Sequence, residues 1–398
     1  MHISANGYSG SRTQLKSGAP DGASSIYNDT IATTGKGLLD LGFNASNYSL
    51  FDVDEWGTVS ILDRTLIEAE AIEVTEEVAI GKQATITVDA IANKTVSKIT
   101  IADKEVAFTQ AGNKITFSAD ATATLDSGVD LEMIITADVK YRASITVYKE
   151  IASKEDYEKM MVGVVTGSGS SAIRAIDGYY VQTANIDLGD KIYYYPYLSN
   201  AAGTAISVQF RGVYDGQGYT ITGGKTSGIF GCVAGTIKNV VLVNTQISAV
   251  SGADRGGAVC NTLQGGGVLD NVYVIGATVI ATCDRAEAFL VGQTYTANTT
   301  IKNCLVVDTG SSKTDNVTAL IGHYGDGVLT NTYAITANGY NAVWSTQVNV
   351  DKYNSCIATD YNAFTTACGQ NISEFKLLTT ESNGNVTVGG IVVYTAQA

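Results

Sequence analysis

Apolar and polar positions in the second half of the chain follow a repeat of about thirty residues. The segments IKNVVLV, LDNVYVI, IKNCLVV and LTNTYAI each have an asparagine at the third position. These residues are Asn239, Asn271, Asn303 and Asn331, at intervals of 32, 32 and 28 residues. A second series, GIFG, AVCN, FLVG and ALIG, ends at Gly231, Asn261, Gly292 and Gly322, at intervals of 30, 31 and 30 residues. Two series with nearly one period indicate stacked structural units.

Each repeat reads as short strands joined by turns, without a helical period of 3.6 residues. This pattern predicts a solenoid of parallel β-coils, in which each coil buries its apolar side against its neighbours. The recurrent asparagine is expected at a bend, because its side chain bonds nearby backbone and tolerates left-handed geometry. Stacked asparagines can also bond to one another in a ladder. The glycines of FRGVYDGQGYTITGG, residues 210–224, are expected where the coil turns.

Two segments are expected to close the solenoid. In IASKEDYEKMM, residues 151–161, Ser153 and Asp156 form a capping box that predicts a short amphipathic helix over the first coil. Such a cover protects an open strand edge. We expect TDYNAFTTACG, residues 359–369, and the strand text VTVGGIVVYTA to close the other end. The predicted β-helix therefore spans 149–370, with capping strands over 371–398.

A different pattern precedes the solenoid. Residues 74–148 contain short alternating strands such as ATITVDAI, NKITFSA and RASITVYK, separated by turns. Their number and spacing predict an immunoglobulin-like β-sandwich, which most often serves as a spacer. The predicted fold class is therefore all-β.

Three segments carry a family resemblance. GYYVQTANIDLG, FRGVYDGQGYTI and GIFGCVAGTIKNVVLV resemble the right-handed β-helix region of bacterial surface proteins with GLUG-type repeats. The resemblance covers about residues 150–365 and implies a right-handed parallel β-helix. It says less about function, because the repeat occurs in adhesins, large surface proteins and phage-associated proteins alike.

A second resemblance concerns residues 1–73. The segment VDEWGTVSILDRTLIEAEAI resembles the closing strand of laminin-G-like, concanavalin-type jelly rolls. It implies a partial jelly-roll segment and a chain that is a piece of something larger. Residues 52–77 hold nine acidic residues and one arginine. They are interpreted as a solvated acidic face, with a Ca²⁺ site as the alternative; no other cofactor is predicted.

Charge and cysteine content narrow the function classes. The formal net charge of −14 disfavours binding to nucleic acid or to an anionic membrane. The sequence contains no run of 18 apolar residues, so no membrane-spanning helix is predicted. None of the six cysteines belongs to a CxxC pair, which disfavours zinc. Most are interpreted as small buried apolar residues, and a disulfide between Cys356 and Cys368 is left open.

The repeat region contains no recognisable arrangement of catalytic residues. The histidines are His2 and His323, so no serine–histidine–aspartate arrangement is predicted. The pairs Asp254–Arg255 and Asp284–Arg285 recur 30 residues apart, one coil along. They are interpreted as a surface ion-pair ladder, with a catalytic or ligand-binding pair as the alternative.

Aromatic residues are the candidate ligand-binding groups. Exposed aromatic faces stack on sugar rings and anchor protein interfaces. The alternative is that these rings cover the sheet or pack in the interior. The candidates are Tyr193, Tyr194, Tyr195 and Tyr197 in KIYYYPY, together with Tyr214 and Trp344 in later turns.

The sequence thus predicts a non-enzymatic extracellular protein of a cell surface or a virion appendage, which binds glycan or a host surface. One alternative is a polysaccharide-degrading lyase or glycosidase on the same scaffold, since glycoside hydrolysis needs two carboxyl groups at one groove. The other is a structural filament or stalk subunit. Self-association into a homo-oligomer or a filament is compatible with all three.

Overall fold

A computed structural model describes residues 51–53, 59–61, 69–167, 172–193, 197–199, 205–248, 255–281, 287–295, 298–310, 317–323, 327–344, 353 and 355–396. The chain divides into two compact units. The first is built mainly from residues 85–121 and 131–145, and the second from residues 77–84, 122–130 and 146 onward. Within the described ranges, no helix is long and apolar enough to cross a membrane.

The first unit consists of short strands that bury every second side chain. Ile99 and Ile101, on one strand, and Ile115 and Phe117, on another, are almost completely buried while their neighbours face outward. This alternation is the one predicted for the region, whereas the immunoglobulin-like topology stays a prediction. The antiparallel pairs are β6 (Lys98–Ile101) with β7 (Lys104–Glu105), β8 (Thr109–Ala111) with β9 (Lys114–Phe117), and β10 (Gly128–Thr136) with β6.

Little of residues 1–73 lies within the described ranges. Strands β1 (Phe51–Val53) and β2 (Val59–Ile61) form an antiparallel pair. Strand β3 (Glu70–Ala71) runs parallel to β11 (Lys140–Ile151). The jelly-roll resemblance falls mostly outside the described residues and stays a prediction.

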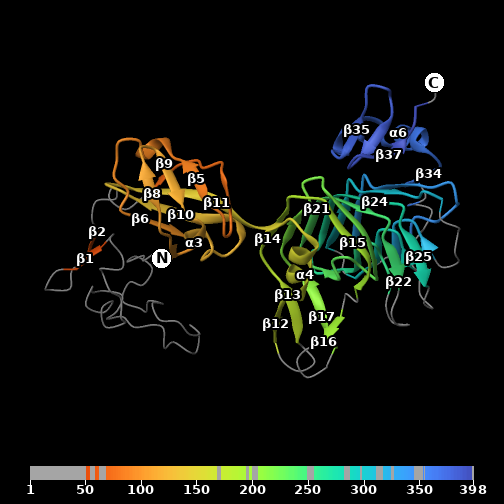
Figure 1. Cartoon of the computed structure of the whole chain (residues 1–398), viewed down its shortest axis with the longest axis horizontal. Helices are drawn as coiled ribbons and strands as arrows, with labels where there is room; N and C mark the ends of the chain where they lie inside the picture. The colour runs from red at the N-terminus through yellow and green to blue at the C-terminus, as the bar shows by residue number, and fades with distance from the viewer. Residues whose placement is uncertain are drawn as a thin grey trace, which may run out of the picture. The chain divides into compact units, whose positions relative to one another are not determined.

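The second unit is a β-solenoid of about five turns, so the predicted all-β fold with stacked coils is confirmed (Figure 1). Its coils pair in parallel and in register. One interior column runs through Tyr180, Tyr214, Ile237, Leu269, Ile301 and Leu329. The strands on this side are β14 (Tyr179–Gln182), β18 (Val213–Asp215), β21 (Thr236–Val243), β24 (Val268–Ile275), β28 (Thr299–Lys302) and β32 (Gly327–Thr330).

The coils have further columns of strands. The column past the asparagine bend contains β15 (Ile186–Tyr193), β19 (Thr220–Thr226), the second halves of β21 and β24, then β29 (Leu305–Val307), β33 (Tyr333–Ile335) and β34 (Ile357–Ala358). Strands β22 (Gln246–Ser248) and β25 (Thr278–Ala281) form a separate column that continues from the end of β19. The opposite sheet contains β13 (Ile173–Ile176), β17 (Ala205–Phe210), β20 (Cys232–Val233), β23 (Cys260–Leu263), β27 (Val291–Thr294) and β31 (Ile321–His323). Its register aligns Gly231, Asn261, Gly292 and Gly322, as the second sequence series predicts.

Glycine is required where coils touch at their corners. A Cβ at Gly212 would lie 2.1 Å from the backbone oxygen of Gly178 in the preceding coil. At Gly216 it would lie 2.5 Å from the backbone oxygen of Asn239 in the next coil. The glycine-rich text of residues 210–224 therefore permits strands to turn at van der Waals contact with their neighbours.

Aromatic and aliphatic side chains fill the interior of the solenoid. Phe210 and Phe230 meet edge to face with ring centroids 5.8 Å apart, and Tyr214 lies 4.8 Å from Phe230. All three are fully buried. Above the first coil, helix α4 (Lys154–Val162) adds Tyr157, Met160 and Met161 to the same core.

The predicted capping box at the start of α4 is present. The Asp156 backbone N–H donates to the Ser153 hydroxyl oxygen at 3.2 Å, and that hydroxyl donates to the Asp156 carboxylate at 2.8 Å. The Ala152 N–H also donates to this carboxylate. The helix therefore begins where the sequence predicts, with its first donors satisfied.

The C-terminal segment packs on a flank of the solenoid rather than only on its end. Outward-facing side chains of the coils, including Val241, Tyr273 and Leu305, form a second apolar core with Phe364 and Phe375. The Leu377 N–H donates to the Tyr273 hydroxyl at 3.4 Å. This corrects the expected end cap: the coil strands are apolar on both faces, so the outer face must be covered. The covering elements are α6 (Tyr361–Cys368), η7 (Gly369–Glu374), β35 (Leu378–Thr380), β36 (Val386–Val388) and β37 (Ile391–Tyr394).

Described cysteines are free thiols in the core or at its margin. Cys356 and Cys368 are both unbridged, so the disulfide that the sequence left open is absent. Cys304 is fully buried, and burial raises the pKa of its thiol to about 12. Cys260 is likewise buried, and burial raises its pKa well above the usual value. These thiols stay protonated at neutral pH and pack as small apolar side chains.

Candidate functional site

The tyrosine-rich loop is only partly described, and its first ring is buried. Tyr193 packs edge to face on Tyr157 at 5.9 Å and donates its hydroxyl proton to Glu158 at 2.9 Å. The Lys191 ammonium, followed by the Tyr193 hydroxyl, holds the pKa of Glu158 below its usual value. Tyr193 thus joins the helical cap to the coil. Tyr194 and Tyr195 lie outside the described residues, as does the side chain of Tyr197, which begins β16 (Tyr197–Ser199).

Of the remaining aromatic candidates, one is interior and one is exposed. Tyr214 is fully buried and donates its hydroxyl proton to the Gln182 side chain at 3.0 Å, so its ring offers no face to a ligand. Trp344 is 40% exposed. The structure adds Tyr295, which is 71% exposed and which the sequence pattern did not single out. Alternating burial cannot identify Tyr295, because it follows the last residue of its strand.

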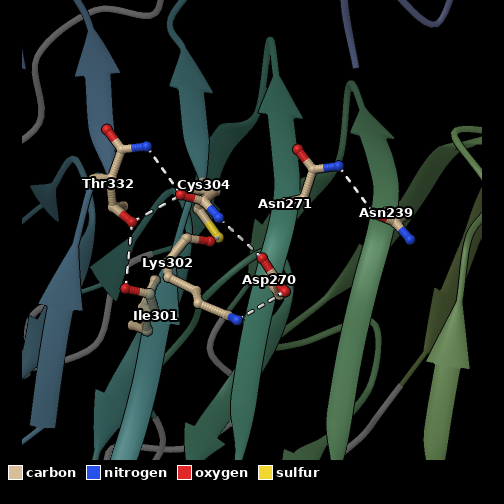
Figure 2. A network of polar contacts seen from close by, with 9 residues as sticks. Asn239, Asp270, Asn271, Ile301, Lys302, Cys304 and Thr332 are labelled. Atoms are coloured by element: carbon tan, nitrogen blue, oxygen red, sulfur yellow. Dashed lines mark hydrogen bonds and ion pairs between the residues drawn. The ribbon is translucent and has the colours of Figure 1, made fainter. Parts of the chain in front are cut away.

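The predicted asparagine column is present at the bends of four successive coils. Asn239, Asn271, Asn303 and Asn331 all have left-handed φ angles, between 45° and 58°. The Asn271 side-chain amide donates to the Asn239 carbonyl oxygen at 2.9 Å, as Figure 2 shows, and Asn331 donates to Asn303 in the same way at 2.9 Å. The ladder predicted from stacking is therefore confirmed in these two pairs.

A column of alternating charges runs beside the asparagines. Asp215, Lys238, Asp270 and Lys302 are register partners in successive coils. The Lys238 ammonium lies 3.0 Å from the Asp215 carboxylate, and Lys302 lies 3.1 Å from Asp270 (Figure 2). The signal was present in the sequence, because the residue before each asparagine is Lys, Asp, Lys and then Thr. Sequence reasoning missed it by considering the asparagines alone.

Asp215 is the most enclosed member of this column, with 3% of its surface exposed. Its carboxylate accepts from the Asn239 amide at 3.0 Å and from the Gln217 backbone N–H at 3.0 Å. The Tyr179 hydroxyl donates at 3.4 Å, and burial followed by the nearby Asp215 charge raises the pKa of Tyr179 strongly. Together with the Lys238 ion pair, these donors make Asp215 a structural carboxylate.

The ladder changes partner once. The Asn303 amide donates to the Asp270 carboxylate at 3.2 Å instead of to Asn271. Among the described residues, the buried Asn271 side-chain oxygen consequently has no hydrogen-bond partner. Asp270 thus repeats the arrangement of Asp215, with one amide and one ammonium group on a single carboxylate.

The Asp–Arg pairs expected one coil apart lie mostly outside the described residues, so that ladder stays a prediction. Asp254, Asp284 and Arg285 lie outside the described residues. Arg255 is directed to the side-chain oxygen of Gln293, and Asn261 donates to the Arg255 backbone oxygen at 2.7 Å. Arg255 thus belongs to a polar cluster on the opposite sheet.

A cavity of about 620 Å³ lies beside the helical cap. Its wall contains Ile151, Met160, Ile176 and Tyr180, from β11, α4, β13 and β14. Lysine and carboxylate side chains also line it. Sequence patterns assign these residues to strands and a helix but do not bring them to one hollow.

In the part of the chain that the structure describes, no group of three or more His, Cys, Asp or Glu side chains is arranged to hold a metal ion. The acidic stretch 52–77, considered as a Ca²⁺ site, has its side chains mostly outside that part, so this alternative stays a prediction.

Comparisons with known proteins give one weak structural match to report. No family model matches the chain, and no curated protein matches it. A crystal structure titled "putative immunoglobulin A1 protease", from Bacteroides ovatus, is similar at 14% identity with a TM-score of 0.32. The similarity covers 60% of this chain and 91% of that one. At this level we draw no conclusion from it.

Proposed function

We propose that this protein is a non-catalytic surface or virion-appendage module that binds glycan through its β-solenoid. The main support for the proposal is that carboxylates of the solenoid form ion pairs and hydrogen bonds with neighbouring coils. Asp215 and Asp270 each hold a lysine and an asparagine of a neighbouring coil, and Asp177 holds Arg211 through two hydrogen bonds. These acids are committed to joining coils, whereas a glycosidase needs two carboxyl groups free to act on one bond.

Exposed aromatic side chains supply a surface for the ligand. Three successive coils are aligned at Val291, Ile321 and Val343. Tyr295 lies four residues after Val291, and Trp344 directly follows Val343. By this register Tyr295 and Trp344 lie two coils apart, about 10 Å along the solenoid axis, and three residues apart along the strand direction, about 10 Å more. Two exposed rings at this spacing suit an extended chain of sugar rings, which stack on aromatic faces.

A β-solenoid is compatible with a surface protein, and we place this one outside the cytoplasm. The net charge of −14 supports a partner other than nucleic acid. Because each coil contacts mainly its neighbours, end-to-end association into a homo-oligomer or filament is also compatible with the fold.

The proposal is tested by glycan-array binding of the whole chain and of the variants Trp344→Ala and Tyr295→Ala. We expect binding that each variant weakens and that Tyr219→Ala leaves unchanged, since Tyr219 is an exposed ring that directly precedes β19, in a different strand column. Incubation with the bound polysaccharides checks the enzymatic alternative. Depolymerisation would contradict the proposal in favour of a lyase or glycosidase, and absence of any binding would favour a structural subunit.

A further inference from the structure

The cavity beside α4 combines an apolar wall with a charged rim. All of its lining residues belong to the second unit. Ile151, Ile176 and Tyr180 are buried in the wall, while Val162 and Val164 at the rim are 52% and 69% exposed. Exposed valines next to a hollow mark a surface that a ligand can cover. The cavity volume of about 620 Å³ falls in the range of small-molecule sites.

The three carboxylates that line the cavity already have partners. Glu150 lies 3.5 Å from the Lys82 ammonium and accepts from the Thr183 hydroxyl at 2.8 Å. Asp156 is used in the capping box of α4. Asp177 binds Arg211 at 2.7 and 2.9 Å. Glu150 and Asp177 are thus paired with cations, and Asp156 is held by hydrogen bonds from neutral donors.

Two of the three lysines that line the cavity are in the opposite situation, the third being Lys82. Lys149 and Lys159 line it with exposed side chains, and neither forms an ion pair with a carboxylate of the described residues. The Lys149 ammonium lies over the Tyr180 ring, 5.5 Å from its centroid. This contact holds one positive charge at the edge of the apolar wall, where an anion is attracted more strongly than in bulk water.

We propose that this cavity binds the carboxylate of an acidic sugar, with Lys149 and Lys159 as its cationic contacts. The apolar faces of the sugar ring pack against the wall of Met160 and Ile176. This inference rests on the proposed function for the nature of the ligand, a glycan. The positive charges of Lys149 and Lys159 add the inference that the bound sugar is acidic.

The experiment titrates the whole chain with N-acetylneuraminic acid, digalacturonic acid, neutral galactose and octanoate, using calorimetry at low salt. We expect saturable binding of an acidic sugar, weaker binding in 0.5 M salt because small ions screen the charges, and no binding of galactose. Lys149→Gln and Lys159→Gln should each weaken binding about tenfold or more, the value of one charge-assisted hydrogen bond. Lys376→Gln is the matched control, since Lys376 is also exposed, belongs to the same unit and does not line the cavity.

Several results would overturn the inference. Absence of acidic-sugar binding at millimolar concentration, or binding that both lysine variants retain, removes the cavity as the site. Octanoate binding as tightly as the sugars removes the sugar assignment. If glycan-array binding still depends on Trp344 in that case, the proposed function stands and only this inference fails. Thermal unfolding of each variant confirms that the fold is retained.

Discussion

Replacing Asn271 by alanine tests whether the asparagine column stabilises the solenoid through its side chains. Asn271 is 3% exposed, has a φ of 58° and donates to Asn239 at 2.9 Å. Alanine at a left-handed position costs about 1 kcal/mol. Loss of the buried hydrogen bond costs a further ~1–3 kcal/mol. Removal of the Asn271 oxygen, which lacks a described partner, offsets part of this, so we expect about 2–3 kcal/mol in total.

Asn244 is the matched control. It has a φ of 53° and is exposed, and within the described part of the chain no side-chain hydrogen bond is seen for it. Asn244→Ala should therefore cost only the backbone contribution, about 1 kcal/mol. The difference between the two variants isolates the side-chain ladder. Combining Asn271→Ala with Asn239→Ala should give a non-additive result, because the two residues share one bond.

Urea unfolding measured by tryptophan fluorescence gives these free energies. The chain has two tryptophans, Trp56 and Trp344, and only Trp344 belongs to the solenoid. In a Trp56→Phe background, the remaining signal reports on the coils. Equal destabilisation by Asn271→Ala and Asn244→Ala, within about 0.5 kcal/mol, would refute the reasoning, because the asparagines would then act only through their backbone.

Three further predictions concern the carboxylates and thiols. Asp215→Ala should lower the free energy of unfolding by about 2–4 kcal/mol in the same urea assay, because it leaves several buried donors without an acceptor; a loss below 1 kcal/mol would contradict the structural role. Glu158 has a lowered pKa, so its stabilisation is complete above the usual value of 4.5 and is lost as pH falls through the folded-state value. The ion pair should contribute at most ~1 kcal/mol, because it is partly exposed. The melting temperature of the wild type should therefore exceed that of Glu158→Gln at neutral pH, and the difference should shrink below pH 4.5. A difference that does not change with pH would show that the ion pair contributes nothing. At pH 8, iodoacetamide followed by peptide mass spectrometry should modify Cys304 only after unfolding, because its pKa is about 12, whereas the partly exposed Cys356 should react earlier; equal rates in the native protein would show that Cys304 is accessible.

Several features of the solenoid could be predicted from the sequence because they depend on local geometry. A coil repeats its bend at one position, so asparagine recurs there with a left-handed φ, and periodicity alone located the column at Asn239 and Asn271. The helix start at Ser153 was equally local, since a capping box involves residues three apart. The need for glycine at the coil corners also follows from the glycine-rich turn sequence of residues 210–224.

Other features required the tertiary structure. The outer covering of the coils depends on residues more than a hundred positions apart, such as Tyr273 and Leu377. In the run NVVLV, Val240 and Leu242 join the interior core while Val241 and Val243 join the outer one, and no local pattern says which segment covers that outer face. The burial of Tyr193 and Tyr214, chosen as ligand-binding rings, was likewise decided by what stacks above and below them.

The sequence by itself therefore determined the coil, its period and its bends, because each is set by backbone geometry within a few residues. Only the tertiary structure decided which aromatic rings face solvent, which carboxylates are consumed in cross-coil contacts and where a cavity forms. These properties depend on register between coils and on long-range packing. In a stacked fold, one residue of register separates an interior side chain from an exposed one.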